Sequence, residues 1–221
     1  AIFFIQKNWY DYFMQKTETK NMSNNIELEL RAEVTFNQLE KLFTDLNKKT
    51  KQVSQTKRLS AMFLGKINKS NFDIRVRISS NGKTEIVVKK GDFHSYDRIE
   101  NSQEITKGQF IGVVKIFSLF NFKSKITERE NFEFNLGNDI TLVLVKAGSI
   151  TYVEIEKMSN VKNLDQNKSE LLSIIKNFGL KLIKNDKEFN ELCDRLTKCS
   201  DWVFDGSENH VAKLTSMLNS Y

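Results

Sequence analysis

The chain has 221 residues, of which 39% are hydrophobic and 11% aromatic, and this content excludes a globally disordered protein. Its 34 lysine and arginine residues exceed its 28 acidic residues, and the resulting net charge of +6 favours an anionic partner without specifying one. Two cysteines are too few for a disulfide scaffold, and no apolar run approaches the ~18–20 residues of a membrane-spanning helix. We therefore expect a cytoplasmic protein that makes no membrane contact.

The N-terminal part combines an aromatic-rich stretch with a strongly patterned one. Residues 1–22 contain an apolar run that is too short for a signal peptide, and they are predicted to form an N-terminal extension. From Ile26 onward, apolar and charged residues alternate strictly. This alternation predicts a β-strand with Glu27, Glu29 and Arg31 on one face.

The middle of the chain is predicted to be a helix followed by a series of strands. Apolar residues at helical spacing predict an amphipathic helix over residues 36–51. Alternating or short apolar patterns then predict strands at residues 58–67, 72–79, 84–91, 111–120, 126–136, 140–147 and 150–158. The segments Ser80-Asn81-Gly82 and Gly137-Asn138-Asp139 favour hairpin turns.

The C-terminal third returns to helical spacing. A helix over residues 168–178 is expected to end near Gly179, because glycine readily adopts the conformation that terminates helices. A second helix over residues 188–198 is expected to be capped by Asp186, and a last helical segment spans residues 208–219.

The element pattern predicts an α+β fold with a mostly antiparallel sheet and flanking helices. No proline-rich, glycine-rich or highly charged linker divides the chain. We therefore expect one main domain over residues 23–190, with residues 191–221 forming a helical segment that packs on the same domain.

Several predicted strands carry a line of charged side chains opposite their apolar face. These lines are Glu27, Glu29 and Arg31, then Asp73, Arg75 and Arg77, and finally Glu154 and Glu156. A single strand of this kind is most simply explained by exposure to water, whereas three favour a sheet curled into a barrel with a charged lumen. Crowded carboxylates favour a divalent cation such as Mg²⁺ or Mn²⁺, and crowded cations favour an anion. A polyphosphate bridged by a metal satisfies both requirements.

The segment Glu27-x-Glu29-x-Arg31 resembles the ExExK signature of the CYTH superfamily of triphosphate tunnel enzymes. That family includes class IV adenylyl cyclases, thiamine triphosphatases and inorganic triphosphatases. Further segments resemble its motifs in the expected order: Asp73-Ile-Arg75-Val-Arg77, Glu85-Ile-Val-Val-Lys89-Lys90-Gly91, Arg98-Ile-Glu100, Lys125-Ile-Thr-Glu-Arg129 and Tyr152-Val-Glu154-Ile-Glu156. The resemblance extends through most of residues 25–190.

The resemblance implies an eight-stranded antiparallel closed β-barrel that binds a triphosphate inside its tunnel. The implied metal ligands are Glu27, Glu29, Glu154 and Glu156, and the implied catalytic group is Glu27, Glu29 and Arg31. The implied phosphate-binding residues are Arg75, Arg77, Lys89, Lys90, Arg98, Lys125 and Arg129, with Glu100 as a further tunnel residue. The implied activity is Mg²⁺- or Mn²⁺-dependent hydrolysis of inorganic, thiamine or nucleoside triphosphate.

Three other functions stay open. An RNA 5′-triphosphatase would use the lysine-rich stretch at residues 48–58 as an approach path for an RNA 5′ end. An adenylate cyclase would use the ribose 3′-hydroxyl as the attacking group. A non-catalytic polyphosphate-binding tunnel is motivated by two departures from the family pattern: Arg31 replaces the signature lysine, and residues 140–145 contain no acid. The sequence specifies neither the substrate nor the oligomeric state.

Overall fold

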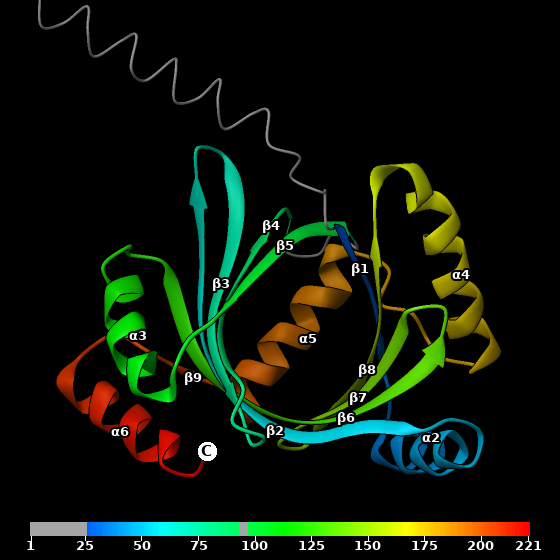
Figure 1. Ribbon diagram of the computed structural model, residues 1–221, viewed down its shortest axis with the longest axis horizontal. Coiled ribbons are helices and arrows are strands. Elements are labelled where there is room, and N and C mark those ends of the chain that lie inside the picture. Colours follow the sequence, from blue (N-terminus) through cyan, green and yellow to red (C-terminus); the bar gives the residue numbers. More distant parts are fainter. Residues whose placement is uncertain (1–25, 93–96) are drawn as a thin grey trace, which may run out of the picture.

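The computed structural model describes residues 26–92 and 97–221 of the chain. The predicted N-terminal extension at residues 1–22 lies outside the described residues. Within the described part, a nine-stranded sheet and five α-helices form a closed barrel with helices around it (Figure 1).

The barrel consists of eight antiparallel strands. They are β1 (Ile26–Glu33), β2 (Gln52–Ile67), β3 (Ser70–Ser79), β4 (Thr84–Lys90), β5 (Asp97–Glu104), β6 (Lys123–Gly137), β7 (Ile140–Ala147) and β8 (Ile150–Ser159). Their order around the barrel is β2-β3-β4-β5-β1-β8-β7-β6, and the pairing of β6 with β2 closes it. The short strand β9 (Trp202–Val203) pairs with the start of β6. The α+β fold with a closed eight-stranded antiparallel barrel is therefore confirmed.

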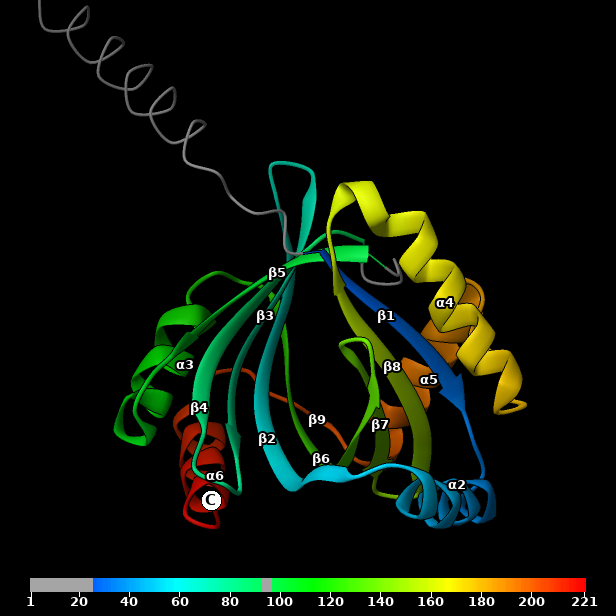
Figure 2. The ribbon, with the colours of Figure 1, turned by 45° about the vertical axis from the view of Figure 1, so that its right-hand side comes forward.

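The helices lie on two sides of the barrel and across its interior. They are α2 (Phe36–Lys49), α3 (Phe110–Ser118), α4 (Leu164–Asn177), α5 (Asp186–Cys199) and α6 (Glu208–Leu218), with 3₁₀ turns η1 (Lys107–Gln109) and η2 (Val161–Asn163) before α3 and α4. Figure 2 shows α2 and α4 on one side of the barrel and α3 and α6 on the other. None of these described helices combines the length and the apolar character needed to cross a membrane.

The alternation of side chains along the strands separates an apolar outer face from a polar inner one. On β1, Leu28 and Leu30 are buried beneath α2 and α4, in a cluster that includes Leu39 of α2 and Leu171 of α4. The residues between them point into the barrel. A second cluster packs α3 and α6 on the outer face of β2 and β3, with Phe63 near its centre. These two parts of the apolar core therefore lie on the outer face of the barrel and leave the inner face of β1 to charged residues.

The prediction of a strand at residues 111–120 is wrong, because this segment lies in α3 and the turn after it. Phe110 and Val114 are buried at helical spacing, whereas Ile116 and Leu119 are exposed. A short apolar run fits either a buried strand or a buried helix by periodicity alone. The eighth strand of the barrel is instead β5, which carries the Arg98-Ile-Glu100 motif.

The sequence predicts the turn glycines correctly and misplaces one helix cap. Gly82 and Gly137 both adopt positive φ in hairpin turns, as expected, and Gly179 has φ +64 just after α4. The cap of α5 is Asn185, whose side chain accepts a hydrogen bond from the backbone N–H of Glu188. The prediction that Asp186 caps this helix is therefore wrong by one residue.

Helix α5 differs from the others because it packs on the inner face of the barrel wall. Its residues Leu192 and Leu196 form a cluster with Val143, Val145 and Tyr152. These β7 and β8 residues alternate with Leu142, Leu144 and Val153, which belong to the outer core. Helix α5 therefore covers part of the lumen with apolar side chains.

Truncation of the outer core should destabilise the barrel strongly. Phe134 of β6 is fully buried and contacts the Phe43 ring of α2 edge-on, with the ring centroids 5.9 Å apart. We expect Phe134→Ala to lower the free energy of unfolding by about 3–5 kcal/mol, because it leaves a cavity. Urea unfolding monitored by circular dichroism measures this loss. Phe36→Ala, on the exposed face of α2, should cost much less, and similar losses for the two variants would contradict this packing.

Candidate functional site

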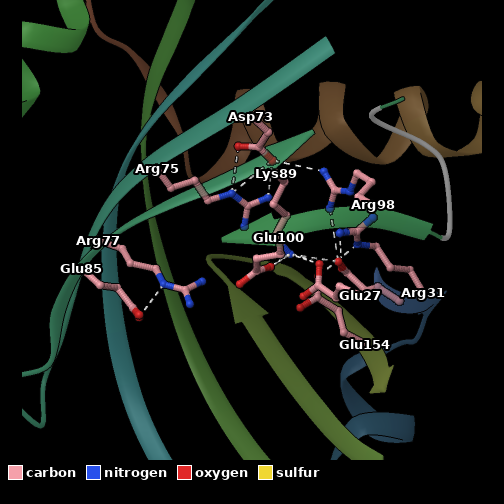
Figure 3. Close-up of polar contacts among 11 residues, drawn as sticks. Glu27, Arg31, Asp73, Arg75, Arg77, Glu85, Lys89, Arg98, Glu100 and Glu154 are labelled. Atoms are coloured by element: carbon pink, nitrogen blue, oxygen red, sulfur yellow. Dashed lines mark hydrogen bonds and ion pairs between the residues drawn. The ribbon is translucent and has the colours of Figure 1, made fainter. Parts of the chain in front are cut away.

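The lumen of the barrel is lined by charged side chains from nearly every strand. Figure 3 shows acidic groups of β1, β5 and β8 facing arginine and lysine side chains of β3, β4 and β5. A cavity of about 250 Å³ is lined by Glu27, Glu29, Arg58, Arg75, Arg77, Lys89, Glu100, Glu133, Thr141, Val143, Glu154 and Glu156. The charged faces that the sequence places on separate strands therefore converge on one site.

Three carboxylates form the acidic centre of this cavity. One oxygen from each of Glu27, Glu29 and Glu156 lies within 4.8 Å of the others. Glu27 and Glu29 are neighbours along the inner face of β1, and Glu156 lies opposite Glu29 in the β1–β8 register. This pairing of like charges across adjacent strands is unfavourable unless protons or cations compensate it.

The acidic residues respond differently to this crowding. Burial and the nearby charge of Glu29 raise the pKa of Glu27 to about 7. Burial together with Glu29 and Glu154 raises the pKa of Glu156 well above its ordinary value. Burial alone would also raise the pKa of Glu29, but Arg31, Lys89 and Arg98 hold it well below the usual range. Glu29 therefore stays ionised, whereas Glu27 and Glu156 readily bind a proton or a cation.

Lys89 and Arg98 connect the acidic centre to the rest of the lumen (Figure 3). The Lys89 ammonium donates a short hydrogen bond to Glu27 and lies 2.9 Å from a Glu100 oxygen and 3.4 Å from a Glu29 oxygen. Arg98 lies 3.3 Å from Glu29 and 3.4 Å from Asp73. Each cation therefore interacts with more than one carboxylate, which satisfies the requirement that buried charges be paired.

The arginines of β3 are also paired with carboxylates. Arg75 makes a two-point interaction with Asp73, with an Nη2–Oδ2 distance of 2.6 Å and an Nε–Oδ1 distance of 3.0 Å. Arg77 donates a 2.8 Å hydrogen bond to Glu85 of β4. Despite burial, the charge of Arg75 keeps the pKa of Asp73 at about 2. A ligand that binds these arginines must share or replace these carboxylates.

A second cavity adjoins the first and is predominantly basic. Its volume is about 120 Å³, and its charged lining consists of Arg31, Arg58, Arg75, Lys125, Arg129 and Glu154. Arg58, Arg75 and Glu154 line both cavities, so they mark the junction between them. On the far side, α5 contributes Phe189 and Leu192. The lumen therefore runs from an acidic compartment to a basic one bounded by α5.

The two cations of the Lys125-Ile-Thr-Glu-Arg129 motif share one carboxylate. The Lys125 ammonium and the Arg129 Nη1 atom each lie 2.7 Å from an Asp201 oxygen. The Asp201 side chain has no exposed surface. Burial opposes ionisation of this group, but hydrogen bonding and charge from Arg129 and Lys125 hold the pKa of Asp201 below its ordinary value.

The structure brings together nearly all of the residues singled out in the sequence. The two cavities are lined by Glu27, Glu29, Arg31, Arg75, Arg77, Lys89, Glu100, Lys125, Arg129, Glu154 and Glu156. Arg98 joins them through its contacts with Glu29 and Asp73. Lys90 does not line these cavities. It alternates with Lys89 along β4, and its side chain is exposed outside the lumen.

Five charged residues at the site carry no tunnel role in the sequence analysis: Arg58, Asp73, Glu85, Glu133 and Asp201. Arg58 is predicted both as the first residue of a strand over residues 58–67 and as the end of the basic stretch. Strand β2 starts earlier, at Gln52, and the Arg58 side chain lines the lumen. The alternation of Arg58 with apolar Leu59 was a usable signal. Asp73 and Glu85 were visible within motifs without a stated role. Asp201 follows α5 and has no strand pattern, so only the fold places it beside Lys125.

The barrel is shared with solved structures of low sequence identity. A candidate adenylate cyclase from Vibrio parahaemolyticus has a TM-score of 0.57 and 14% identity, over 77% of this chain and 99% of that chain. A protein from Pyrococcus horikoshii has a TM-score of 0.58 and 15% identity, over 76% and 99%. A chain of the Schizosaccharomyces pombe Mediator head module has a TM-score of 0.52 and 11% identity, over 71% and 97%.

These likenesses concern the fold, and they agree with the tunnel-type barrel expected from the resemblance to the CYTH superfamily. No protein-family model and no curated protein matches the chain.

Divalent-metal binding to the acidic centre should strengthen as the pH rises through about 7. Glu27 binds its proton more tightly in the folded chain than in the unfolded one. The metal-free protein therefore loses folding stability as the pH rises from 4.5 to about 7 and this proton is released. A Mn²⁺ ion held by Glu27, Glu29 and Glu156 would relieve the repulsion that appears there. The rise in melting temperature caused by Mn²⁺ should be larger at about pH 8 than at about pH 5.5.

Glu27→Gln should reduce this difference between the two pH values, because it removes one titrating ligand. Equal stabilisation of the unsubstituted protein by Mn²⁺ at both pH values would contradict the assignment.

Proposed function

We propose that the chain is a divalent-metal-dependent phosphohydrolase that acts on a triphosphate bound inside the barrel. The observation that carries the proposal is the juxtaposition of a three-carboxylate centre with a compartment lined by arginines and lysines, in two cavities that share Arg58, Arg75 and Glu154. Carboxylate oxygens suit Mg²⁺ or Mn²⁺, whereas the forked donors of arginine suit phosphate oxygens. A metal–triphosphate complex supplies both kinds of partner.

The acidic centre fits a divalent ion. Glu27, Glu29 and Glu156 offer oxygen donors close enough to share one ion. Within the described residues, Glu156 has no ion-pair partner, and burial together with repulsion from Glu29 and Glu154 raises its pKa. Glu154 lies beside this group and is bound to Arg31 through a 3.0 Å contact. When bound, the ion would neutralise phosphate oxygens and lower the pKa of a coordinated water molecule.

The protein's own residues would orient the phosphate chain. Arg58 and Arg75 stand at the junction of the two compartments, where they would contact phosphate groups next to the metal. Arg31 connects the acidic residues to the basic compartment, because it pairs with both Glu29 and Glu154 and lines that compartment. Its role would be to hold the acidic ligands in place. Most of the catalysis would come from positioning and charge neutralisation.

Residues 140–145, which contain no acid, contribute Thr141 and Val143 to the lumen. The proposed carboxylate ligands therefore come from β1 and β8, and we infer a single metal position at Glu27, Glu29 and Glu156. The substrate candidates are inorganic triphosphate, thiamine triphosphate, nucleoside triphosphates and 5′-triphosphorylated RNA. An adenylate cyclase and a non-catalytic polyphosphate binder are the alternatives that the following experiment distinguishes.

Phosphate release from the four candidate triphosphates tests the proposal, with Mg²⁺, with Mn²⁺ and with a chelator. Glu156→Gln is the informative variant, because it removes a ligand without leaving a buried cation unpaired. We expect metal-dependent turnover that falls by about 10²-fold or more in this variant. Glu191→Gln, on an exposed part of α5, is the matched control and should keep full activity.

The products formed distinguish the proposed phosphohydrolase from the alternative functions. Cyclic nucleotide formed from ATP without phosphate release would identify a cyclase. Thermal stabilisation by triphosphate with no turnover would identify a binding protein. Neither turnover nor stabilisation with any of the four compounds would overturn the proposed function.

A further inference from the structure

Two cations that line the basic compartment, Lys125 and Arg129, are paired with an anion supplied by the chain itself, which lies behind the cavity wall. Asp201 bridges Lys125 and Arg129, with a 2.7 Å contact to each and a second Arg129 contact of 3.2 Å. Ser200 adds a hydrogen bond of 3.0 Å to the same carboxylate. Two cationic groups and a hydroxyl around two oxygens form the kind of environment that binds a phosphate group.

The backbone holds Asp201 firmly in this position. The N–H of Asp201 donates to the Leu196 carbonyl at the end of α5, with a distance of 3.0 Å. The next two residues form β9, which pairs with Lys125 and Ile126 of β6. The carboxylate is therefore fixed against Lys125 by elements on both sides of it in the sequence, and its side chain is shielded from water.

Helix α5 bounds the same compartment with apolar side chains. Phe189, Leu192 and Leu196 line the cavity, and the Arg31 guanidinium lies over the Phe189 ring at 5.2 Å from its centroid. The volume of about 120 Å³ is well below the ~300–1,000 Å³ of pockets that hold organic ligands. The compartment has room for a phosphate group but not for a nucleoside.

We propose that Asp201 is a specificity-determining residue that limits the length of the phosphate chain accepted by the tunnel. Its carboxylate fills the position between Lys125 and Arg129 that the next phosphate group of a longer chain would take. The bound chain therefore ends within the basic compartment, short of the position between Lys125 and Arg129, with its organic part or free end toward the acidic compartment. This inference rests on the proposed function for its substrate class.

The test compares the binding of pyrophosphate, tripolyphosphate and tetrapolyphosphate by calorimetry in the presence of Mg²⁺. In the unsubstituted protein, affinity should not increase from tripolyphosphate to tetrapolyphosphate. In Asp201→Asn, the freed cations should make tetrapolyphosphate bind about tenfold more tightly than tripolyphosphate, or better. The matched control is Asp194→Asn, which removes the same charge from an exposed position of α5 and should keep the original profile.

A second measurement uses sulfate and needs no triphosphate binding. Without the Asp201 carboxylate, Lys125 and Arg129 are buried cations that an external anion would stabilise. Sodium sulfate should raise the melting temperature of Asp201→Asn over sodium chloride of equal ionic strength by at least about 3 °C more than it raises that of Asp194→Asn. This comparison remains informative if the Asp201 variant is less stable.

Failure of the proposed function can be distinguished from failure of the inference about Asp201. If neither protein binds tripolyphosphate, the proposed function is wrong, and the sulfate experiment alone decides whether Asp201 occupies an anion position. If Asp201→Asn shows the chain-length profile of the unsubstituted protein and no sulfate-specific stabilisation, the carboxylate only anchors the C-terminal segment. That result would overturn the inference.

Discussion

Charge compensation across the lumen is the interaction on which this structure depends. A closed barrel removes its inner side chains from bulk water, so each charged group there needs a partner of opposite sign. The strands meet this requirement with pairs between neighbours, such as Arg77 with Glu85, and with contacts between strands one apart, such as Lys89 of β4 with Glu27 of β1. The balance fails locally at Glu156, where carboxylates outnumber cations, and this failure makes the acidic centre a good place for a metal ion.

A charged lumen also determines where the apolar core must lie. Because the inner faces are polar, the outer faces of the strands carry the hydrophobic residues, and helices must cover them. The helices α2 and α4 cover β1, β7 and β8, while α3 and α6 cover β2 and β3. The stability of the outer core therefore supports the geometry of the site, since each inward charge on a strand is fixed by the packing of its outward neighbours.

The fold and most of the site could be predicted from the sequence because both depend on alternation along single strands. Glu27 and Glu29, or Arg75 and Arg77, share a face whatever the strand pairs with, and the order of such motifs resembles a known family. The misassigned segment at residues 111–120 contains a short apolar run without a distinguishing period, so only tertiary packing shows that it is a helix. The position of Asp201 depends on the path of the chain after α5, which no local pattern specifies, whereas the alternation of Arg58 with Leu59 indicates the lumen-facing side of Arg58.

The pairing of the lumen arginines and lysines has a consequence for any polyanion that enters. Arg75 holds Asp73, and Lys125 and Arg129 hold Asp201, so a phosphate group gains the full interaction with one of these cations only by replacing a carboxylate. Replacement is hardest where the carboxylate is fully buried and fixed by backbone hydrogen bonds, as Asp201 is. Under the proposed function, the lumen would therefore bind anions unequally along its length. Selectivity for the number of phosphate groups would arise from this gradient, without any contact to an organic part of the ligand.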